Sequence, residues 1–421
     1  ANKYLCRKII SMHRRLSITV ISPYFYPEDT AIGLYTTQFC KYLQNAGHQV
    51  SVLTGFPNYP NWKIFDDYIE KPPYYTETFN GIKVFRYKQY IPDTISIARR
   101  VRMMLSLMWG TMFNIGKVDM ANVVICIVPF TSNIFPAWVL AKKHRAKLWT
   151  HIQDFEFDLA LESGIIKNGV LSGIAAKLIL GFERILLNRA DVISSISNGM
   201  LEKIRRKSKH AQPYYFPNWV SADNINPEKH TRHPLIKKGK FTVLYSGNIG
   251  EKQNWDTLIE ICKKIPAEKD IEILIVGDGV YKNTLEKRVA QFDFVRMAAP
   301  VRYEELNDLL CSADCHILFQ KSDIIDTLMP SKILGMMASA KPSLVTGNMK
   351  SEVAKIFDNS GGGVYLTGEN TDELVATILS WKENASAGAH IGKKARDYIL
   401  REFSERQILH NFEKHILNLC S

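Results

Sequence analysis

The chain has 421 residues, of which 46% are hydrophobic and 23% are charged. These proportions are those of a folded globular protein and exclude a largely disordered one, and the length predicts two or three domains. The net charge of +12 predicts an anionic partner, which leaves a phosphorylated substrate, an acidic membrane surface and nucleic acid as alternatives. Seven scattered cysteines disfavour a disulfide framework and a zinc site, and they indicate a reducing, cytoplasmic compartment.

The first half of the chain alternates short apolar runs with amphipathic ones, which predicts parallel strands joined by helices. A first strand is expected at Leu16–Ser22, and a loop then leads to a helix from Gly33 to Asn45. Gly47 is well placed to end that helix. Further strands are expected at Gln49–Leu53, Val123–Val128, Leu148–Ile152 and Val192–Ser195.

The second half repeats this alternation after a stretch rich in Asn, Pro, Lys and His. Strands are expected at Phe241–Ser246, Ile271–Val276, Cys315–Phe319 and Pro342–Val345. We therefore predict an α/β fold of two Rossmann-like, doubly wound domains. The predicted order is a basic tail at 1–15, a first domain at 16–216, a linker at 217–240, a second domain at 241–395 and a terminal helix at 396–421.

The segment Tyr245–Lys252 (YSGNIGEK) ends a strand and places a lysine where a helix begins. Helix N-termini offer free N–H groups and a partial positive charge, and both suit a phosphate. Gly247 would let the backbone approach such a ligand closely, and Lys252 would add a full charge. Phosphate binding is the functional interpretation, and a plain strand-to-helix turn with a solvated lysine is the alternative.

A second candidate lies at Asp323–Lys332. Pro330 suits the first position of a helix, so that Ser331 and Lys332 would lie in its first turn. A lysine there opposes the helix dipole, which favours a role in function over a role in stability. Asp326 is placed to face a hydroxyl group or a developing positive charge, with a helix cap as the alternative.

Two glycine-containing loops fall short of the GxGxxG fingerprint, so no dinucleotide cofactor is expected. Gly33, after the first strand, is predicted to let the backbone approach a diphosphate. Gly277–Asp278–Gly279 follows a strand of the second half, and a simple turn is its alternative. His151 ends a strand close to Asp154 and is a further site candidate, although a strand histidine is more often structural.

Residues 95–117 combine three arginines with an apolar helical face. The arginines are Arg99, Arg100 and Arg102. The apolar residues are Met103, Met104, Leu105, Leu107, Met108, Trp109 and Phe113. Such a combination predicts a helix that lies on an anionic membrane surface, and a packed surface helix with solvated arginines is the alternative.

Four segments, in their order and spacing, resemble the retaining GT-B glycosyltransferases of family 4. They are ISPYFYPEDTAIGLYT, HIQDFEFD, YSGNIGEKQN and DTLMPSKILGMMASAKP. The resemblance runs from about Leu16 to the end and is closest to bacterial fucosyl- and N-acetylfucosaminyl-transferases of colanic acid, capsule and O-antigen assembly. It implies two domains facing across a cleft, with the nucleotide-sugar on the second, the acceptor on the first, and a last helix that crosses back.

Position within these segments implies several roles. Lys252 matches the diphosphate-binding lysine of the family, Gly33 the glycine that touches the donor phosphates, and His151 the histidine near the transferred sugar. The pairs Asp278–Gly279 and Ala298–Ala299 fall where the backbone brackets the base.

The chain also departs from the family pattern. Asn248 stands where most members have an arginine, and Gly335 stands where they have the glutamate that holds the ribose. Asp326 is the nearest carboxylate to the position of the other family glutamate.

The resemblance implies transfer of a hexose, without a metal or cofactor, from a UDP- or GDP-sugar to a polyprenyl-diphosphate-linked saccharide at the cytoplasmic face of the inner membrane. We expect catalytic roles for His151, Lys252 and Asp326. Further donor contacts are expected from Gly247, Asn248, Ser331 and Lys332, and membrane or acceptor contacts from Arg99, Arg100, Arg102 and Trp109. A nucleotide-sugar 2-epimerase of the same fold and a catalytically lapsed assembly protein at the membrane are the alternatives, and no nucleic-acid partner is expected.

Overall fold

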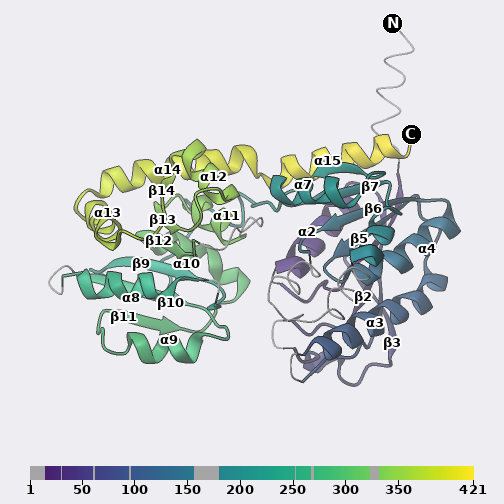
Figure 1. Cartoon of the computed structure of the whole chain (residues 1–421), viewed down its shortest axis with the longest axis horizontal. Helices are drawn as coiled ribbons and strands as arrows, with labels where there is room; N and C mark the ends of the chain where they lie inside the picture. Colours follow the sequence, from purple (N-terminus) through teal and green to yellow (C-terminus); the bar gives the residue numbers. More distant parts are fainter. Residues whose placement is uncertain are drawn as a thin grey trace, which may run out of the picture. The chain divides into compact units, whose positions relative to one another are not determined.

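The structure is a computed structural model that describes residues 15–29, 31–59, 62–93, 96–155, 180–251, 253–266, 270–322 and 331–421. The chain divides into two compact units (Figure 1). Unit 1 comprises Ala1–Pro217 with Leu409–Ser421, and unit 2 comprises Asn218–Ile408.

The described part of unit 1 is built on an eight-stranded sheet in the order β3-β4-β2-β1-β5-β6-β7-β8. Its strands are β1 (Ser17–Ile21), β2 (Gln49–Gly55), β3 (Tyr74–Phe79), β4 (Ile82–Tyr87), β5 (Val123–Val128), β6 (Lys147–Ile152), β7 (Val192–Ser195) and β8 (Gln212–Tyr215). All neighbours are parallel except β3 and β4, which form an antiparallel hairpin. The chain builds outward from β1 in one direction and then returns to β5, so the strand order reverses between β1 and β5.

Several described helices of unit 1 follow its parallel strands. Among them are α2 (Ala31–Asn45), α3 (Ile97–Asn114), α4 (Ile134–His144) and α7 (Asn198–Lys207). The central strands β1 and β5 are apolar and almost entirely buried, as expected for parallel strands that are covered on both faces.

Unit 2 has a six-stranded parallel sheet in the order β11-β10-β9-β12-β13-β14 among its described residues. The strands are β9 (Phe241–Ser246), β10 (Ile271–Val276), β11 (Val295–Ala298), β12 (Cys315–Phe319), β13 (Ser343–Thr346) and β14 (Gly363–Leu366). Here the order reverses between β9 and β12. The two doubly wound sheets confirm the predicted α/β fold class.

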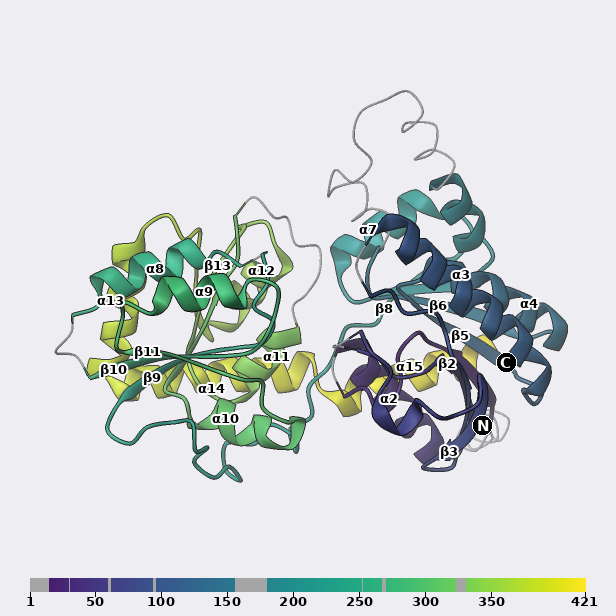
Figure 2. The ribbon, with the colours of Figure 1, turned by 90° about the horizontal axis from the view of Figure 1, so that it is seen from below.

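Helices cover both faces of the second sheet. They are α8 (Trp255–Lys264), α9 (Lys282–Val289), α10 (Leu306–Ser312), α11 (Ser331–Ala338), α12 (Glu352–Ser360), α13 (Thr371–Glu383) and α14 (Ala385–Glu402). Figure 2 shows α8 and α9 on one side of the sheet, and α10 and α14 on the other. Asparagine and serine side chains cap several of these helices, for example Asn254 on α8 and Ser351 on α12.

The predicted linker 217–240 is not a free connector, because residues 218–240 belong to unit 2 and bind its surface. The Asn226 N–H donates to Asn307, and Arg396 donates to the Ile225 carbonyl at 2.7 Å. Polar residues in this stretch therefore serve as hydrogen-bond partners for unit 2 rather than marking a solvated linker.

The prediction of one continuous helix over 396–421 is wrong, because the structure has two helices there. Two helices, α14 and α15 (Glu405–Leu419), meet at Phe403 and Ser404. The break occurs where the backbone pairs with Val220: the Val220 N–H donates to the Phe403 carbonyl, and the Glu405 N–H donates to the Val220 carbonyl. Main-chain pairing that forms only in the tertiary structure interrupts a helical sequence pattern.

The end of α15 belongs to unit 1 and packs there through Phe412, which is 1% exposed. Its ring lies 4.5 Å from Phe216, 4.6 Å from Trp149 and 4.9 Å from Phe39. Glu413, on the same helix, accepts from the Tyr42 hydroxyl at 2.9 Å and lies 3.2 Å from His48. An aromatic core contact and a polar pair together attach the C-terminus to unit 1.

Replacement of Phe412 by alanine should lower the free energy of unfolding of unit 1 by about 3–5 kcal/mol, because it empties an aromatic core site. Denaturant unfolding followed by circular dichroism measures this. The matched control is Phe113→Ala, because Phe113 is 70% exposed and its loss should change the free energy by less than about 0.5 kcal/mol. Equal effects of the two substitutions would contradict the packing of α15 described above.

Candidate functional site

The point at which strand order reverses in unit 2 lies between the carboxyl ends of β9 and β12. In open parallel sheets, ligands bind at such points, because the loops on either side leave in opposite directions. The loop after β9 begins with Gly247, and α11 is the next described element after β12. Gly247 and the first turn of α11, which holds Lys332, therefore lie at the edge where a ligand is expected.

Gly247 and Lys332 are in contact. A Cβ atom built on Gly247 would lie only 2.2 Å from Cε of Lys332, and the glycine has a φ of 139° that other residues rarely adopt. A side chain at this position would displace the end of the lysine side chain from the place it occupies. The first turn of α11 thereby brings its cation against the end of β9.

The Lys332 ammonium group binds only neutral oxygen atoms among the described residues. It donates to the Tyr245 hydroxyl at 2.8 Å and to the Asn248 carbonyl at 3.2 Å, while Tyr245 donates to the same carbonyl at 2.6 Å. Burial lowers the pKa of Lys332 to about 8. Its positive charge has no carboxylate partner in the described part of the chain, so an anion placed here would stabilise the charged form.

Two further glycines bring the loops after β9 and β10 together. A Cβ on Gly277 would lie 1.9 Å from the Gly247 carbonyl oxygen, and one on Gly279 would lie 2.4 Å from that of Ile249. The Ile249 N–H donates to the Asp278 carbonyl at 2.7 Å. Backbone therefore packs directly on backbone in this turn, and the predicted contact of Asp278–Gly279 with the base stays a prediction.

The remaining predicted donor residues lie at or near the same edge. Asp278 is exposed and 3.9 Å from Lys282, and Ala298 ends β11, where its carbonyl accepts from the Gly277 N–H at 3.1 Å. Asn248 and Ala299 are exposed. Lys252 and Asp326 lie outside the described residues, as does the side chain of Ser331. Their predicted roles stay predictions.

Gly335 lies in α11, one turn after Lys332. A Cβ there would approach only Leu310, at 3.2 Å. The position could hold a small side chain after a slight shift of Leu310. Close packing is therefore not the reason that a glycine stands where the family has a glutamate.

His151 occupies the carboxyl half of β6 in unit 1 and is 3% exposed. Its Nδ1 atom is 2.9 Å from the Ser194 hydroxyl, which also accepts from the indole N–H of Trp149 at 2.7 Å. Burial lowers the pKa of His151 to about 3, so that the ring is neutral at physiological pH. A neutral, hydrogen-bonded ring can orient a neighbouring group, and a contact with a sugar stays a prediction.

Gly33 lies in the first turn of α2, where a Cβ would be 2.5 Å from the Glu28 carbonyl oxygen. The glycine therefore allows a close contact with Glu28 of the same loop, and its predicted approach to a diphosphate stays a prediction. Sequence reasoning missed Glu28 itself, which is 2% exposed. Its carboxylate accepts from the N–H groups of Phe25, Asn58 and Tyr59 at 2.9–3.2 Å, and burial raises its pKa to about 7.

The predicted interfacial helix is α3, and its apolar residues divide between two faces. Met103, Met104 and Leu107 are buried in a core cluster with Phe130, so their assignment to a membrane-facing surface is wrong. The exposed apolar residues repeat every fourth position, as Val101, Leu105, Trp109 and Phe113. Arg99, Arg100 and Arg102 are exposed at the same end of the helix as Val101, and the Arg102 guanidinium lies 4.2 Å from the centre of the Tyr90 ring.

No helix among the described residues is both long enough and apolar enough to cross a membrane. The described residues likewise contain no cluster of three His, Cys, Asp or Glu side chains arranged to hold a metal ion.

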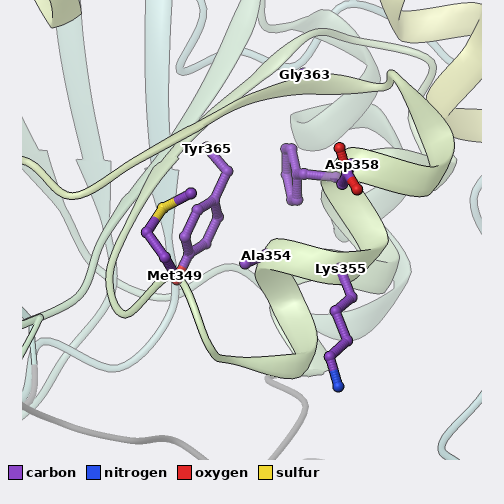
Figure 3. A pocket seen from close by; sticks show the side chains of 7 residues that line it. Met349, Ala354, Lys355, Asp358, Gly363 and Tyr365 are labelled. Atoms are coloured by element: carbon purple, nitrogen blue, oxygen red, sulfur yellow. The ribbon is translucent and has the colours of Figure 1, made fainter.

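A groove of about 520 Å³ lies elsewhere on unit 2, between α12 and the edge strand β14. Figure 3 shows Tyr365 and Met349 on one wall, and Lys355 and Asp358 on α12. β14 is separated from β9 by β12 and β13, so this groove is distinct from the Gly247–Lys332 edge.

Comparisons with known proteins agree with this architecture. A family model described as "Glycosyl transferases group 1" matches residues 226–398, and one described as "Glycosyl transferase 4-like domain" matches residues 30–219. The putative colanic acid biosynthesis glycosyl transferase WcaI of Escherichia coli K12 is 30% identical over 416 residues, which cover 94% of this chain and 98% of that protein.

Two solved structures share the fold. Sucrose-phosphate synthase from Thermosynechococcus elongatus has a TM-score of 0.74 and 15% identity, covering 96% of this chain and 99% of that one. Anabaena HepE, in complex with UDP and glucose, has a TM-score of 0.67 and 13% identity, covering 96% and 100%.

The lowered pKa of Lys332 predicts how anion binding depends on pH. Below about pH 8 the side chain is mostly charged and should bind inorganic diphosphate. As pH rises from 8 to 9 the charged fraction of the free protein, and with it the affinity, should fall roughly fivefold. Calorimetric titration with inorganic diphosphate measures this. Lys332→Arg should flatten the decline, because arginine keeps its charge, and Lys332→Met should bind weakly throughout. An unchanged slope in Lys332→Met would assign the pH dependence to another group.

Proposed function

Because the chain belongs to the glycosyl transferases of group 1, we propose that it moves a hexose from a UDP- or GDP-sugar to an acceptor hydroxyl with retention of anomeric configuration. The contact of Lys332 with Gly247, at the edge where strand order reverses, is the observation that supports the proposal most. It provides a cation, a close backbone approach and a helix N-terminus at one place, and these groups suit a diphosphate.

The departing nucleoside diphosphate gains negative charge as the bond between the anomeric carbon and its phosphate oxygen breaks. Lys332 and the N–H groups of the first turn of α11 would stabilise that charge without a metal, and one such fixed donor contributes about 3 kcal/mol in related sites. The acceptor oxygen forms the new bond to the anomeric carbon, and its proton passes to the departing phosphate. Retention is consistent with this path, because no base is needed on the opposite face of the sugar.

Lys332 also supplies a cation beside Asn248, where the chain departs from the family pattern. Most relatives of this type place an arginine there, whereas here the Asn248 carbonyl accepts a hydrogen bond from the Lys332 ammonium. A cation on α11 would thus replace the cation on the loop after β9. We further propose that Lys252 contacts the diphosphate, and that Asp326 and His151 act near the transferred sugar, as the family resemblance implies.

The proposed acceptor is a polyprenyl-diphosphate-linked saccharide of a bacterial surface polysaccharide. Two observations support it: the similarity to WcaI, a protein described as a putative colanic acid biosynthesis glycosyl transferase, and the net charge of +12, which suits an anionic acceptor and membrane.

The exposed stripe of α3, formed by Val101, Leu105, Trp109 and Phe113, supports a location at the cytoplasmic face of the inner membrane. Trp109 is 53% exposed and lies in one row with Leu105 and Phe113, and the three arginines adjoin the N-terminal end of that row. A stable water-facing surface rarely places four large apolar side chains in one helical row. Apolar insertion and attraction to anionic lipid would act together there.

Nucleotide-sugar binding tests the donor site. Calorimetry with UDP-glucose, UDP-galactose and GDP-fucose should detect binding of at least one donor to the wild type. Lys332→Ala should weaken that binding at least tenfold, because the diphosphate loses a charged donor. Lys264→Ala is the control, since it removes a lysine of the same unit that pairs with Asp372, a residue with no predicted role in donor binding. Absence of binding by the wild type to any UDP- or GDP-sugar would overturn the proposed function.

Vesicle binding tests the membrane surface. Substitution of Arg99, Arg100 and Arg102 by serine should reduce pelleting with phosphatidylglycerol-rich vesicles by about two orders of magnitude, at roughly 1 kcal/mol for each charge. The control replaces Arg205, Arg206 and Lys209, which are also exposed and carry the same total charge. Equal losses in both triple variants would show that net charge, and not α3, governs membrane binding.

A further inference from the structure

The carboxyl ends of β1, β2 and β5 in unit 1 carry a continuous row of aromatic rings. Tyr24 follows β1, Tyr59 and Trp62 follow β2, and Phe130 follows β5. The ring centres of Tyr24 and Phe130 are 6.2 Å apart, those of Tyr24 and Tyr59 are 5.6 Å apart, and those of Tyr59 and Trp62 are 6.3 Å apart. Because strand order reverses between β1 and β5, this row lies where an open sheet offers its binding edge.

The row has a buried end and an accessible part. Phe130 packs into the core cluster with Met103, Met104 and Leu107 of α3, and Trp62 packs against the same cluster. Tyr24, Tyr59 and Trp62 are only half-buried. Trp62 and Phe130 are thus held from behind by a helix whose opposite face carries the exposed stripe, and Tyr24 and Tyr59 continue the row from them.

Two members of the row have backbone conformations that bulky residues rarely adopt. Trp62 has a φ of 55° and Phe130 a φ of 67°, both in the left-handed region. Glycine or asparagine would fit these turns with less strain, and residues held in such conformations cluster at ligand-binding sites. The large rings therefore stand at these positions despite a conformational cost.

A buried carboxylate fixes the two loops that carry Tyr24 and Tyr59. Glu28 accepts from the Phe25 N–H at 3.2 Å in the first loop, and from the N–H groups of Asn58 and Tyr59, each at 2.9 Å, in the second. Arg86 of β4 is fully buried and donates to two carbonyls, that of Tyr26 in the first loop and that of Gly55 just before the second. Burying these charges is costly unless they are paired, and here they are used to hold loops rather than to fill a core.

We propose that Tyr24, Tyr59 and Trp62 form a stacking surface for a pyranose ring of the acceptor, with Glu28 as the residue that positions the loops beneath it. The proposal rests on the proposed function and names the chemistry of its acceptor side. One face of a pyranose ring presents C–H groups, which pack against aromatic faces. The tyrosine hydroxyls are polar groups of the kind that sugar hydroxyls bind.

The tyrosine hydroxyls favour a sugar over a lipid chain as the occupant of this surface, because a lipid chain offers them no hydrogen-bond partner. Helix α3 places Met103, Met104 and Leu107 behind Trp62 and Phe130, and it places Val101, Leu105, Trp109 and Phe113 on its exposed side. A lipid-linked sugar needs both a polar-aromatic surface and an apolar one, and α3 contributes to each. A nucleotide base is the competing aromatic-binding ligand, and the experiment below distinguishes it.

Saturation-transfer NMR on the full chain, with methyl α-glucoside, methyl α-galactoside and methyl α-fucoside as probes, tests the surface. At least one glycoside should bind the wild type, and Tyr59→Ala or Tyr24→Ala should weaken it at least tenfold. Tyr59→Phe should keep most of the affinity, because the ring remains. Tyr398→Ala, which removes a half-buried tyrosine from α14 of unit 2, should leave glycoside binding unchanged.

UDP binding, measured by calorimetry on the same variants, separates the possible failures. Two outcomes would overturn the stacking surface and leave the proposed function standing. In the first, the wild type binds UDP but no glycoside; in the second, Tyr59→Ala binds the glycoside with unchanged affinity. Loss of UDP binding in Tyr59→Ala would assign the rings to the nucleotide base and also overturn it. Failure of the wild type to bind any UDP- or GDP-linked ligand would instead overturn the proposed function.

The positioning role of Glu28 has its own test. Glu28→Gln imitates the protonated carboxyl, so at pH 8 it should bind the glycoside several-fold more weakly than the wild type. The two proteins should converge toward pH 6, where the wild-type carboxyl becomes protonated. The other charged groups around it are Arg86 and its ion-pair partner Glu77, which both proteins share. A constant difference from pH 6 to 8 would indicate a purely structural loss, and no difference would remove Glu28 from the site.

Discussion

The absence of a side chain at Gly247 shapes the edge of unit 2 at the carboxyl ends of β9 and β12, where we propose that the donor binds. It allows Cε of Lys332 to lie 2.2 Å from the position that a Cβ atom of residue 247 would occupy. Helix α11, which follows β12, can therefore place its cation against the end of β9. Tyr245 and the Asn248 carbonyl then hold the ammonium group. Gly277 and Gly279 extend the same arrangement, because each permits a main-chain contact that any Cβ would prevent.

The two units share one topology, and we propose that they bind different ligands with it. In both sheets the strand order reverses next to the first strand of the unit, which leaves a binding edge at the carboxyl ends. In unit 2 that edge carries glycines and a lysine without an acidic partner among the described residues, and it suits an anion. In unit 1 it carries half-buried aromatic rings and suits a sugar face. Loop residues, rather than the sheet, decide which ligand each edge accepts.

Buried charge marks both edges. Glu28, Arg86 and Lys332 are ionisable groups held largely away from water, and burial shifts the pKa of Glu28 upward and that of Lys332 downward. Well-packed apolar residues would stabilise a fold at lower cost. Each of these groups instead fixes a loop or offers a charge at a strand end, which is the pattern expected where a sequence trades stability for binding.

The sequence by itself determined the fold class, because buried parallel strands and amphipathic helices have distinct apolar periods, and glycine turns mark strand ends. It also contained a signal that was overlooked: Asn80–Gly81 between two alternating runs indicates the β3–β4 hairpin. Local pattern likewise singled out Gly247 and Lys332 as separate candidates, one on a strand end and one on a helix start.

Only the tertiary structure decided which candidates meet. Lys332 is 85 positions from Gly247 in the sequence, and Glu28 binds the backbone of residues thirty positions away, so no local pattern could reveal either contact. The same holds for α3, where the spacing of apolar residues alone did not separate the buried methionines from the exposed stripe. It also holds for the break between α14 and α15. In each case a partner distant in the chain, through burial or main-chain pairing, determined what the local pattern left open.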